Sequence, residues 1–293
     1  MPLLQIIVNV LTIDAHEMEH ALRIGPAGWS YPDWEGTVYP PHGSKFDPLA
    51  YLASFFDTIE INSPFYRIPP ASHALSWVRR VADNPQFRFT TKIFRGFTHD
   101  RAVVAANDVK AFRAYLDPLA EADRLGAVLL QYPWSFKHSE ESRQRLLQLF
   151  GDFQGYPLAL EVRHASFQSE DFTRFLEDHS VSWVNVDQPL FSDSVKPAAS
   201  ATGPVGYVRL HGRNYEKWFA HQQSWERYNY LYSAQELQPW VERIGEIAAA
   251  RETYVITNNH FRGQAIVNAG DLKEALGQSP AVPPQLASIY GDR

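Results

Sequence analysis

The feature that most constrains this fold is a repeated alternation of short apolar runs with segments of helical spacing. Eight runs of strand length recur, on average every ~30 residues, over residues 23–30, 58–65, 88–94, 126–132, 158–164, 182–188, 205–212 and 253–259. Strands that alternate with helices pair in parallel, because each helix carries the chain back to the start of the next strand. Eight such units in 293 residues fit a (β/α)8 TIM-like barrel, an α/β fold.

The absence of other motifs and the composition of the two ends of the chain limit the extent of the predicted barrel. The sequence contains neither a glycine-rich GxGxxG turn after the first run nor a P-loop, which disfavours a doubly wound nucleotide-binding fold. We therefore expect a single barrel domain over residues 22–280. Residues 1–21, an apolar stretch followed by acidic residues and histidines, are interpreted as an N-terminal extension, and residues 281–293 as a C-terminal tail.

The composition disfavours several classes of function. The chain has 27 basic and 33 acidic residues and a formal charge of −6, whereas general nucleic-acid binders are usually basic. It has no cysteine, so disulfides, thiolate metal sites and a cysteine nucleophile are excluded. No run approaches the ~18 apolar residues of a membrane span. We expect a cytoplasmic protein with no membrane partner.

Polar residues are set into the strand predicted for residues 205–212. Tyr207, Arg209 and His211 share one face of this strand, because strand side chains alternate between the two faces. An arginine and a histidine cost free energy when they are buried without a partner or a wet pocket. The face that carries them is therefore predicted to contribute to a binding or catalytic site.

The same design recurs at other strand ends, where the active sites of (β/α)8 barrels lie. By side-chain parity, the residues predicted to point into the barrel are Glu60, Lys92, Glu161, Asp187, Arg209 and His211. Any one of them could be a polar residue that a neighbour satisfies. Repetition of the pattern at the same end of seven strands favours a common site, in which opposite charges shift each other's pKa.

Three kinds of chemistry are open at such a site. The residues assigned to acid–base catalysis are Glu161, His211, Lys92, Glu60 and Asp187. The carboxylates would serve as acid and base, and the imidazole as a proton shuttle. An anion site is a further possibility, in which the phosphate or carboxylate of a small-molecule ligand is clamped by Lys92, Arg163, Arg209 and Arg213. No cofactor is predicted; if a divalent metal binds, Glu161, Asp187 and His211 are its candidate ligands.

Further residues are predicted to bind the ligand. They are cationic, amide and aromatic side chains at strand ends and in loops. The set comprises Arg209, Arg163, Asn62, Gln131, Asn258, Tyr31, Trp29, Tyr230 and His99. The loop over residues 214–232 is rich in tyrosine, tryptophan and phenylalanine. Such a loop either packs as a satellite cluster on the barrel rim or forms a lid that stacks on a sugar or base ring.

Several motifs, taken in order, resemble the DUF72 family, also called YecE-like. They are Gly28-Trp-Ser-Tyr31, Ile59-Glu-Ile-Asn-Ser63, Leu129-Leu-Gln-Tyr-Pro133, Leu160-Glu-Val-Arg-His164, Arg209-Leu-His-Gly212 and Asn258-Asn259. The resemblance covers about residues 23–276 and implies a TIM-like barrel, but no established reaction. The mechanisms of retaining glycosidase and Schiff-base aldolase barrels do not transfer. Strands four and seven end in Gln131 and Arg209, and Lys92 stands on strand three and not on strand six.

We therefore expect an enzyme, either a hydrolase or a lyase or isomerase, that acts on a small polar ligand, anionic or sugar-like, by acid–base chemistry. Two alternatives stay open. One is a metal-dependent phosphodiesterase or nuclease of the endonuclease-IV-like barrel type, by fold-level analogy. The other is a non-catalytic ligand-binding barrel. Nucleic acid is the less favoured partner because the chain is acidic overall.

Overall fold

The computed structural model describes residues 20–41, 43–100 and 104–291. Its strands are β1 (Leu22–Pro26), β2 (Thr58–Ile61), β3 (Arg88–Lys92), β4 (Leu125–Gln131), β5 (Leu158–Glu161), β6 (Ser182–Asp187), β7 (Gly206–Leu210) and β8 (Thr253–Thr257). They form one sheet in the order β1-β8-β7-β6-β5-β4-β3-β2, and all paired neighbours are parallel. The predicted N-terminal extension, residues 1–21, lies outside the described residues except at positions 20 and 21.

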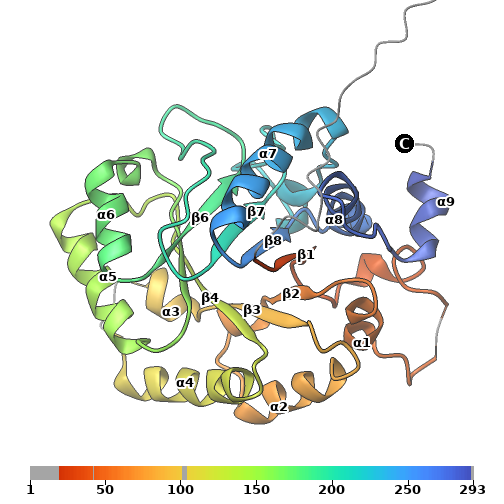
Figure 1. Ribbon diagram of the computed structural model, residues 1–293, viewed down its shortest axis with the longest axis horizontal. Coiled ribbons are helices and arrows are strands. Elements are labelled where there is room, and N and C mark those ends of the chain that lie inside the picture. Colours follow the sequence, from red (N-terminus) through yellow and green to blue (C-terminus); the bar gives the residue numbers. More distant parts are fainter. Residues whose placement is uncertain (1–19, 42, 101–103, 292–293) are drawn as a thin grey trace, which may run out of the picture.

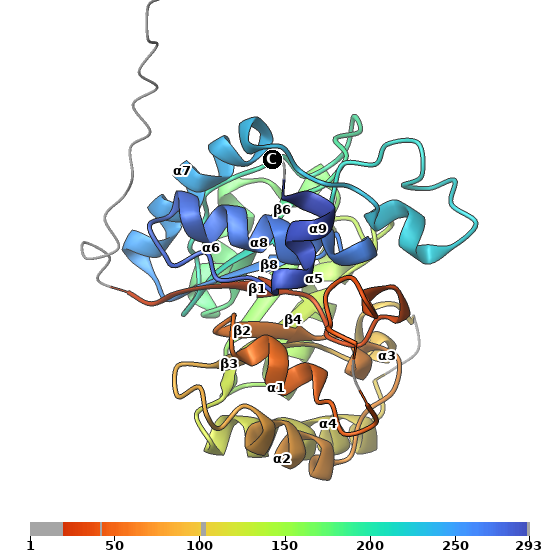
Figure 2. The ribbon, with the colours of Figure 1, turned by 90° about the vertical axis from the view of Figure 1, so that its right-hand side faces the viewer.

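The sheet curls into a nearly closed barrel. The two end strands, β1 and β2, meet through a bridge between Ala27 and Glu60 and a hydrogen bond of 2.8 Å from the Gly28 N–H to the Glu60 carbonyl. Figure 2 shows the barrel from the side, with the loops after β1, β3 and β7 on the right, opposite to the start of β1. The predicted (β/α)8 TIM-like barrel is confirmed.

Helices surround the sheet and cover its outer face (Figure 1). They are α1 (Pro48–Ala53), α2 (Ala71–Arg80), α3 (Arg95–Thr98), α4 (Ala106–Glu121), α5 (Glu140–Asp152), α6 (Glu170–Asp178), α7 (Ala234–Ala250), α8 (Gln264–Ala275) and α9 (Ala287–Tyr290). One connection departs from the alternation, since residues 188–205, all of them described, join β6 to β7 without a helix. The second strand is also shorter than predicted, because Pro64 lies in a 3-10 turn over Ser63–Phe65.

Local sequence signals explain several helix starts. Asp47 caps α1 by accepting hydrogen bonds from two backbone N–H groups, and Pro48 occupies the first helical position. Ser139 caps α5, and Ser233 with Glu236 forms a capping box at the start of α7. Each cap accepts hydrogen bonds from backbone N–H groups that the first turn of its helix leaves without partners.

Two apolar cores lie on the two sides of the sheet. The outer core packs the helices against the strands. The inner core fills the barrel with Ala27, Ala127, Leu129, Ala159, Val184, Val186, Val205, Tyr207, Tyr254 and Ile256. Gly126 makes room for it, because a Cβ at that position would lie 2.4 Å from the Tyr254 ring. The barrel is therefore a packed body whose ligand site must lie at an end.

The segment after α8 packs back on the barrel. Within residues 281–291, Pro284–Leu286 and α9 are helical, and Leu286 is buried close to Gly263 at the start of α8. No helix in the ranges that the structure describes is both long and apolar enough to cross a membrane.

Candidate functional site

A charged layer crosses the barrel interior at the carboxyl ends of the strands. Arg209 on β7 forms two ion pairs there. Its Nη2 lies 2.6 Å from Oε1 of Glu60 on β2, and its Nη1 lies 2.5 Å from Oε2 of Glu161 on β5. All three side chains are fully buried. One guanidinium therefore joins three strands and places a positive charge beside each buried carboxylate, as burial requires.

Arg163 and His211 extend this layer. Nη2 of Arg163 lies 2.5 Å from Oε1 of Glu161 and 3.0 Å from Nε2 of His211. Nδ1 of His211 lies 2.9 Å from the side-chain amide of Asn258. That amide atom is Nδ2, which, like the arginine nitrogens, can only donate, so a neutral His211 can accept a hydrogen bond on one of its two ring nitrogens only. Glu161 is clamped between two arginines, and His211 is surrounded by donors.

Burial and neighbouring charges decide the ionisation of this layer. Burial would raise the pKa of Glu161, but Arg163 and Arg209 hold that pKa well below its ordinary value. Burial, with Arg163 next in importance, lowers the pKa of His211 well below its ordinary range. At neutral pH, Glu161 is therefore ionised and His211 is a neutral acceptor.

A cavity of about 740 Å³ opens beside this layer at the mouth of the barrel. It is lined by Tyr31, Pro32, Asp33, Asn62, Phe65, Tyr66, Lys92, Arg95, His99, Gln131, His221, Trp225, Arg227, Tyr228, Asn258, His260 and Phe261. Gln131 connects the lining to the layer, because its Oε1 accepts a hydrogen bond of 3.3 Å from Nη1 of Arg209. A concave site with convergent polar groups is the usual place for a small ligand.

Lys92, at the end of β3, brings an amine to this cavity. It has no ion pair with any described residue, and its Nζ lies 4.3 Å from the centre of the Phe65 ring. Burial, and after it the like charge of Arg209, lowers the pKa of Lys92 to about 8. Glu60 and Glu161 act in the opposite direction, but both are already paired with Arg209. The amine is left to face the cavity without a counter-charge.

Aromatic rings form two walls of the cavity. Tyr31 stacks on His260 with ring centres 4.3 Å apart, and Trp225 stacks on Phe261 with ring centres 4.4 Å apart. Burial lowers the pKa of His260, which favours its neutral form. Trp225 belongs to the aromatic loop over residues 214–232, so this loop supplies part of the cavity wall. Flat apolar faces of this kind suit a sugar or another ring.

The structure divides the predicted site residues into three groups. Those that line the cavity are Tyr31, Asn62, Lys92, His99, Gln131 and Asn258. Those that form the buried layer next to it are Glu60, Glu161, Arg163, Arg209 and His211. Those that lie elsewhere are Asp187, Trp29 and Tyr230. The catalytic roles assigned to the buried layer stay predictions.

The prediction that Asp187 points into the barrel is wrong. Val186, its neighbour on β6, belongs to the inner core, so Asp187 faces outward to α7. Its carboxylate accepts from the Tyr232 hydroxyl and the Trp240 indole N–H, both at 2.6 Å, and pairs with Arg213. Parity alone does not say which face of a fully buried strand is the inner one. Asp187 is stable on the outer face because its three hydrogen-bond donors lie on that side of the sheet.

The residues predicted to hold a metal, if one binds, do not come together. Nε2 of His211 lies 3.4 Å from Oε1 of Glu161, but Asp187 lies on the other face of the sheet. Both oxygens of Glu161 also face arginine nitrogens at 2.5 Å. Within the described ranges, no group of three or more His, Asp or Glu side chains is arranged to hold a metal ion. This donor set does not fit a divalent cation.

Trp29 and Tyr230 lie beside the cavity. Trp29 lines a neighbouring cavity of about 500 Å³ and packs edge-on against Trp77, with ring centres 5.5 Å apart. The hydroxyl of Tyr230 donates to Glu236 at the start of α7, and its ring packs against Tyr232. Both residues hold the loops around the mouth in place.

Several charged or titratable lining residues are missing from the sequence-based set, among them Arg95, Arg227 and His260. Each lies in a loop or at the start of a short helix after a strand, where strand parity gives no information. The position of His260, directly after the amides Asn258 and Asn259, is the one signal that could have indicated it.

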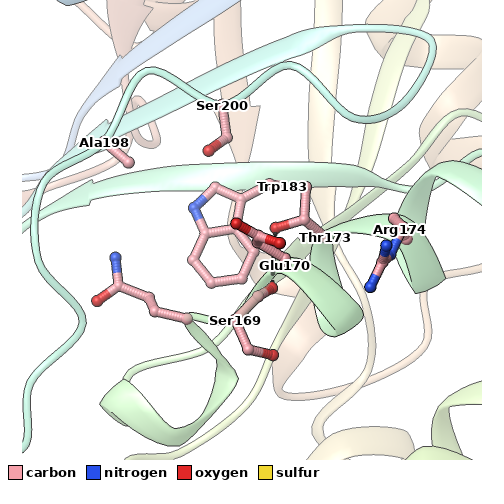
Figure 3. Close-up of a pocket in the computed structure, with 8 residues that line it drawn as sticks. Ser169, Glu170, Thr173, Arg174, Trp183, Ala198 and Ser200 are labelled. Carbon is pink, nitrogen blue, oxygen red and sulfur yellow. Dashed lines mark hydrogen bonds between the residues drawn. The ribbon is translucent and has the colours of Figure 1, made fainter.

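A further cavity, of about 420 Å³, lies on the outside of the barrel between α6 and the segment that joins β6 to β7 (Figure 3). Its lining includes Trp183 from β6, Ser169 and Glu170 at the start of α6, and Ser200. Trp183 is on the same outward face of β6 as Asp187. The charged layer faces the other side of the sheet, so we place the candidate site at the mouth.

Comparisons with known proteins agree with the motifs. The family model described as "Protein of unknown function DUF72" matches residues 23–288. The UPF0759 protein YunF of Bacillus subtilis is 29% identical over 273 residues, which cover 87% of this chain and 94% of the relative. The UPF0759 protein YecE of Escherichia coli (strain K12) is 28% identical over 301 residues, covering 92% and 100%. The crystal structure of a DUF72 family protein from Thermotoga maritima is 34% identical with a TM-score of 0.78, and the match covers 88% of this chain and 100% of that one. The chain therefore belongs to the DUF72 family of proteins of unknown function.

Proposed function

We propose that this protein is an enzyme that binds a small anionic, sugar-like ligand in the mouth cavity and acts on it by acid–base chemistry at Lys92. The observation that carries the proposal is the position of the Lys92 amine. It lines the cavity, while Glu60 and Glu161 are already paired with Arg209. A bound anion would supply the negative charge that no described residue provides as an ion-pair partner for Lys92.

The cavity lining supports an anionic ligand. Its described residues include the cations Lys92, Arg95 and Arg227 against one carboxylate, Asp33. The Asp33 carboxylate already accepts a hydrogen bond of 2.6 Å from a backbone N–H of the loop after β8. The cavity volume, about 740 Å³, is within the range of small-molecule sites.

Two further features support a sugar-like ligand. The side-chain amides of Asn62, Gln131 and Asn258 lie in the lining and could bind hydroxyl groups. The stacked rings of Tyr31 and His260 offer a flat face against which a sugar ring could pack. Charge, amides and rings together favour a phosphorylated or carboxylated sugar.

The pKa of Lys92 suits proton transfer. A general acid or base works best when its pKa lies near the operating pH, and burial with the nearby Arg209 brings Lys92 to about 8. At pH 7 roughly one amine in ten is then neutral, so both proton forms are available. A non-catalytic ligand-binding barrel would use the same cavity and is the second candidate.

The test begins with binding. Purified protein is titrated calorimetrically at low salt with ribose 5-phosphate, fructose 6-phosphate, gluconate and inorganic phosphate. We expect Lys92→Met to weaken binding ~10-fold or more, because a charge-assisted contact is lost. The matched control is Lys110→Met on the exposed side of α4, which should bind like the parent.

Turnover then separates the two candidates. The ligands that bind are incubated with the protein and followed by NMR. Conversion of a ligand by the parent but not by Lys92→Met supports the enzyme, whereas binding without conversion supports the non-catalytic barrel. Absence of binding for all four probes, or equal binding by the parent and Lys92→Met, overturns the proposal.

A further inference from the structure

We infer that Lys92 acts as a nucleophile: the mouth cavity takes an anionic carbonyl compound, an aldehyde or ketone that carries a phosphate or carboxylate, and Lys92 forms an imine with it. This inference rests on the proposed function, because it uses the same cavity and the same anionic ligand. It adds the functional group that the ligand must carry and the bond that forms.

The geometry leaves the Lys92 amine uncommitted. No described residue forms a hydrogen bond or ion pair with its Nζ, and its one close contact is the face of the Phe65 ring at 4.3 Å. Lys273, which is buried, shows the usual arrangement, since its Nζ donates a hydrogen bond of 2.9 Å to the Phe55 carbonyl. An amine held in that way serves structure, whereas a free amine that faces a cavity can attack a ligand.

The arginines of the charged layer keep Lys92 free. Arg209 occupies Oε1 of Glu60 and Oε2 of Glu161, and Arg163 occupies the other oxygen of Glu161. A carboxylate released from these pairs would bind the ammonium and suppress its reactivity. Burial and the charge of Arg209 also lower the pKa of Lys92 to about 8, which enriches the neutral, nucleophilic amine.

Other lining residues can serve the remaining parts of the ligand. Arg95 and Arg227 supply cations for the phosphate or carboxylate. Oε1 of Gln131 accepts from Arg209, which leaves the amide NH₂ group to donate to the carbonyl oxygen. Burial, followed by the charge of Lys92, lowers the pKa of His99 to about 4. His99 is therefore neutral and able to accept a hydrogen bond from the ligand.

The reaction balances without a co-reactant. The neutral amine attacks the carbonyl carbon, a C–N bond forms, and the π electron pair moves to the oxygen. The oxygen takes up a proton and the nitrogen loses one, which gives a neutral carbinolamine. The hydroxyl is then protonated and leaves as water while the nitrogen lone pair forms the C=N bond, and loss of the second N–H proton gives the imine. The net change is amine plus carbonyl to imine plus water. Because Lys92 lies on the third strand, the mechanism of aldolase barrels does not carry over by analogy, and the inference rests only on the accessible, partly neutral amine that imine formation needs.

The experiment uses pyridoxal 5′-phosphate, an anionic aldehyde, and pyridoxal, which lacks the phosphate. The full-length protein is incubated with each probe at pH 7.5, reduced with sodium borohydride and digested, and labelled lysines are identified by mass spectrometry. Lys110, exposed on α4, is the internal reference. We expect pyridoxal 5′-phosphate to label Lys92 ~10-fold faster than Lys110 or more, because the amine is partly neutral. Equal labelling rates at the two lysines overturn the inference.

Two variants test the details. Arg227→Gln should slow labelling of Lys92 by pyridoxal 5′-phosphate but not by pyridoxal, because only the phosphate uses that cation. Lys92→Arg keeps the positive charge and cannot form an imine, so it should retain phosphate binding and lose the label. If pyridoxal labels Lys92 no faster than Lys110 even in the parent, the amine is not activated and the inference fails.

Failure of this inference can be told apart from failure of the proposed function. If inorganic phosphate or a sugar phosphate binds in calorimetry but borohydride leaves Lys92 unmodified, the imine is wrong and the anion site stands. If neither binding nor labelling occurs, both are wrong. Labelling that rises with pH through about 8 and is blocked by a bound sugar phosphate supports both.

Discussion

Nη1 of Arg209 on β7 lies 2.5 Å from Oε2 of Glu161 on β5, and neither side chain is exposed. Desolvation of two charges is unfavourable, and only close contact and further partners offset it. Arg209 finds a second partner in Glu60, and Glu161 a second one in Arg163. The resulting layer ties strand ends together and fixes which charges remain available at the mouth.

Arg209→Met is expected to destabilise the fold by about 3–5 kcal/mol, because two buried carboxylates lose their common partner. Arg209→Lys should fall between this variant and the parent, since an ammonium keeps the charge but loses the two-pronged geometry. Urea unfolding of each variant gives the free energies. The control is Arg79→Met on the exposed side of α2, with an expected change within about 0.5 kcal/mol. Parent-like unfolding of Arg209→Met would contradict the role of Arg209 as the buried partner.

Glu161 should make the fold sensitive to acid. Its pKa in the folded protein lies well below the ordinary value of 4.5, because Arg163 and Arg209 outweigh the effect of burial. The stability that Glu161 contributes is therefore complete above about pH 4.5 and is lost as the pH falls toward the folded-state pKa. Glu161→Gln should be less stable than the parent at pH 7, and the gap should narrow below pH 4.5. A gap that stays constant from pH 7 to pH 3 in urea titrations would show that Glu161 is not held by this pairing.

The barrel and the charged layer could be predicted because both follow from periodicity. Strand–helix alternation indicates parallel strands, and parity places Arg209 and Glu161 on inner faces. The structure shows that Arg209 is the buried partner of Glu161. It also shows a second partner, Arg163, which parity does not indicate. Arg163 lies two residues beyond Glu161, just past the end of β5, and contacts that carboxylate from there.

The remaining site residues could not be predicted because periodicity does not reach them. Every residue of β6 is buried, so the hydrophobic pattern does not distinguish the inner face from the outer one, and parity predicts the wrong face for Asp187. Arg227 lies in a loop with no regular spacing. Lys92 is left without an ion pair to any described residue because Arg209 pairs with both Glu60 and Glu161. This pairing depends on the folded geometry and cannot be read from the sequence pattern.

Asp187 is expected to anchor α7 and the aromatic loop to β6. Its carboxylate has three donors, from Tyr232, Trp240 and Arg213, and an amide would satisfy them only in part. Asp187→Asn should therefore cost about 2–4 kcal/mol of unfolding free energy in urea. Asp178→Asn, at the exposed end of α6, is the control. A loss of phosphate affinity without a loss of stability would argue that Asp187 acts on the ligand and not on the fold.

Lys92→Met is expected to stabilise the empty protein. The ordinary pKa of lysine is 10.5, and burial and Arg209 lower that of Lys92 to about 8. Below pH 8, keeping Lys92 protonated therefore lowers the free energy of unfolding. Because the side chain is partly exposed, we expect the loss to be about 1–2 kcal/mol. Between pH 8 and 10.5 the unfolded chain binds more protons, so the stability of the parent should rise with pH. Methionine at position 92 has no charge to bury, so the variant should lack both this loss of stability and the rise of stability between pH 8 and 10.5.

The measurement is urea unfolding of the parent, Lys92→Met and Lys110→Met without ligand, at pH 7, 8.5 and 10. Lys92→Met should exceed the parent in stability at pH 7 by about 1–2 kcal/mol, and the difference should shrink as the pH rises. Lys110→Met should follow the parent throughout, because that side chain is exposed. The stabilised Lys92→Met protein should also have lost phosphate binding, as expected where a site maintains a charge at the expense of stability. A lysine that serves the fold would give the opposite result, a less stable Lys92→Met protein at pH 7.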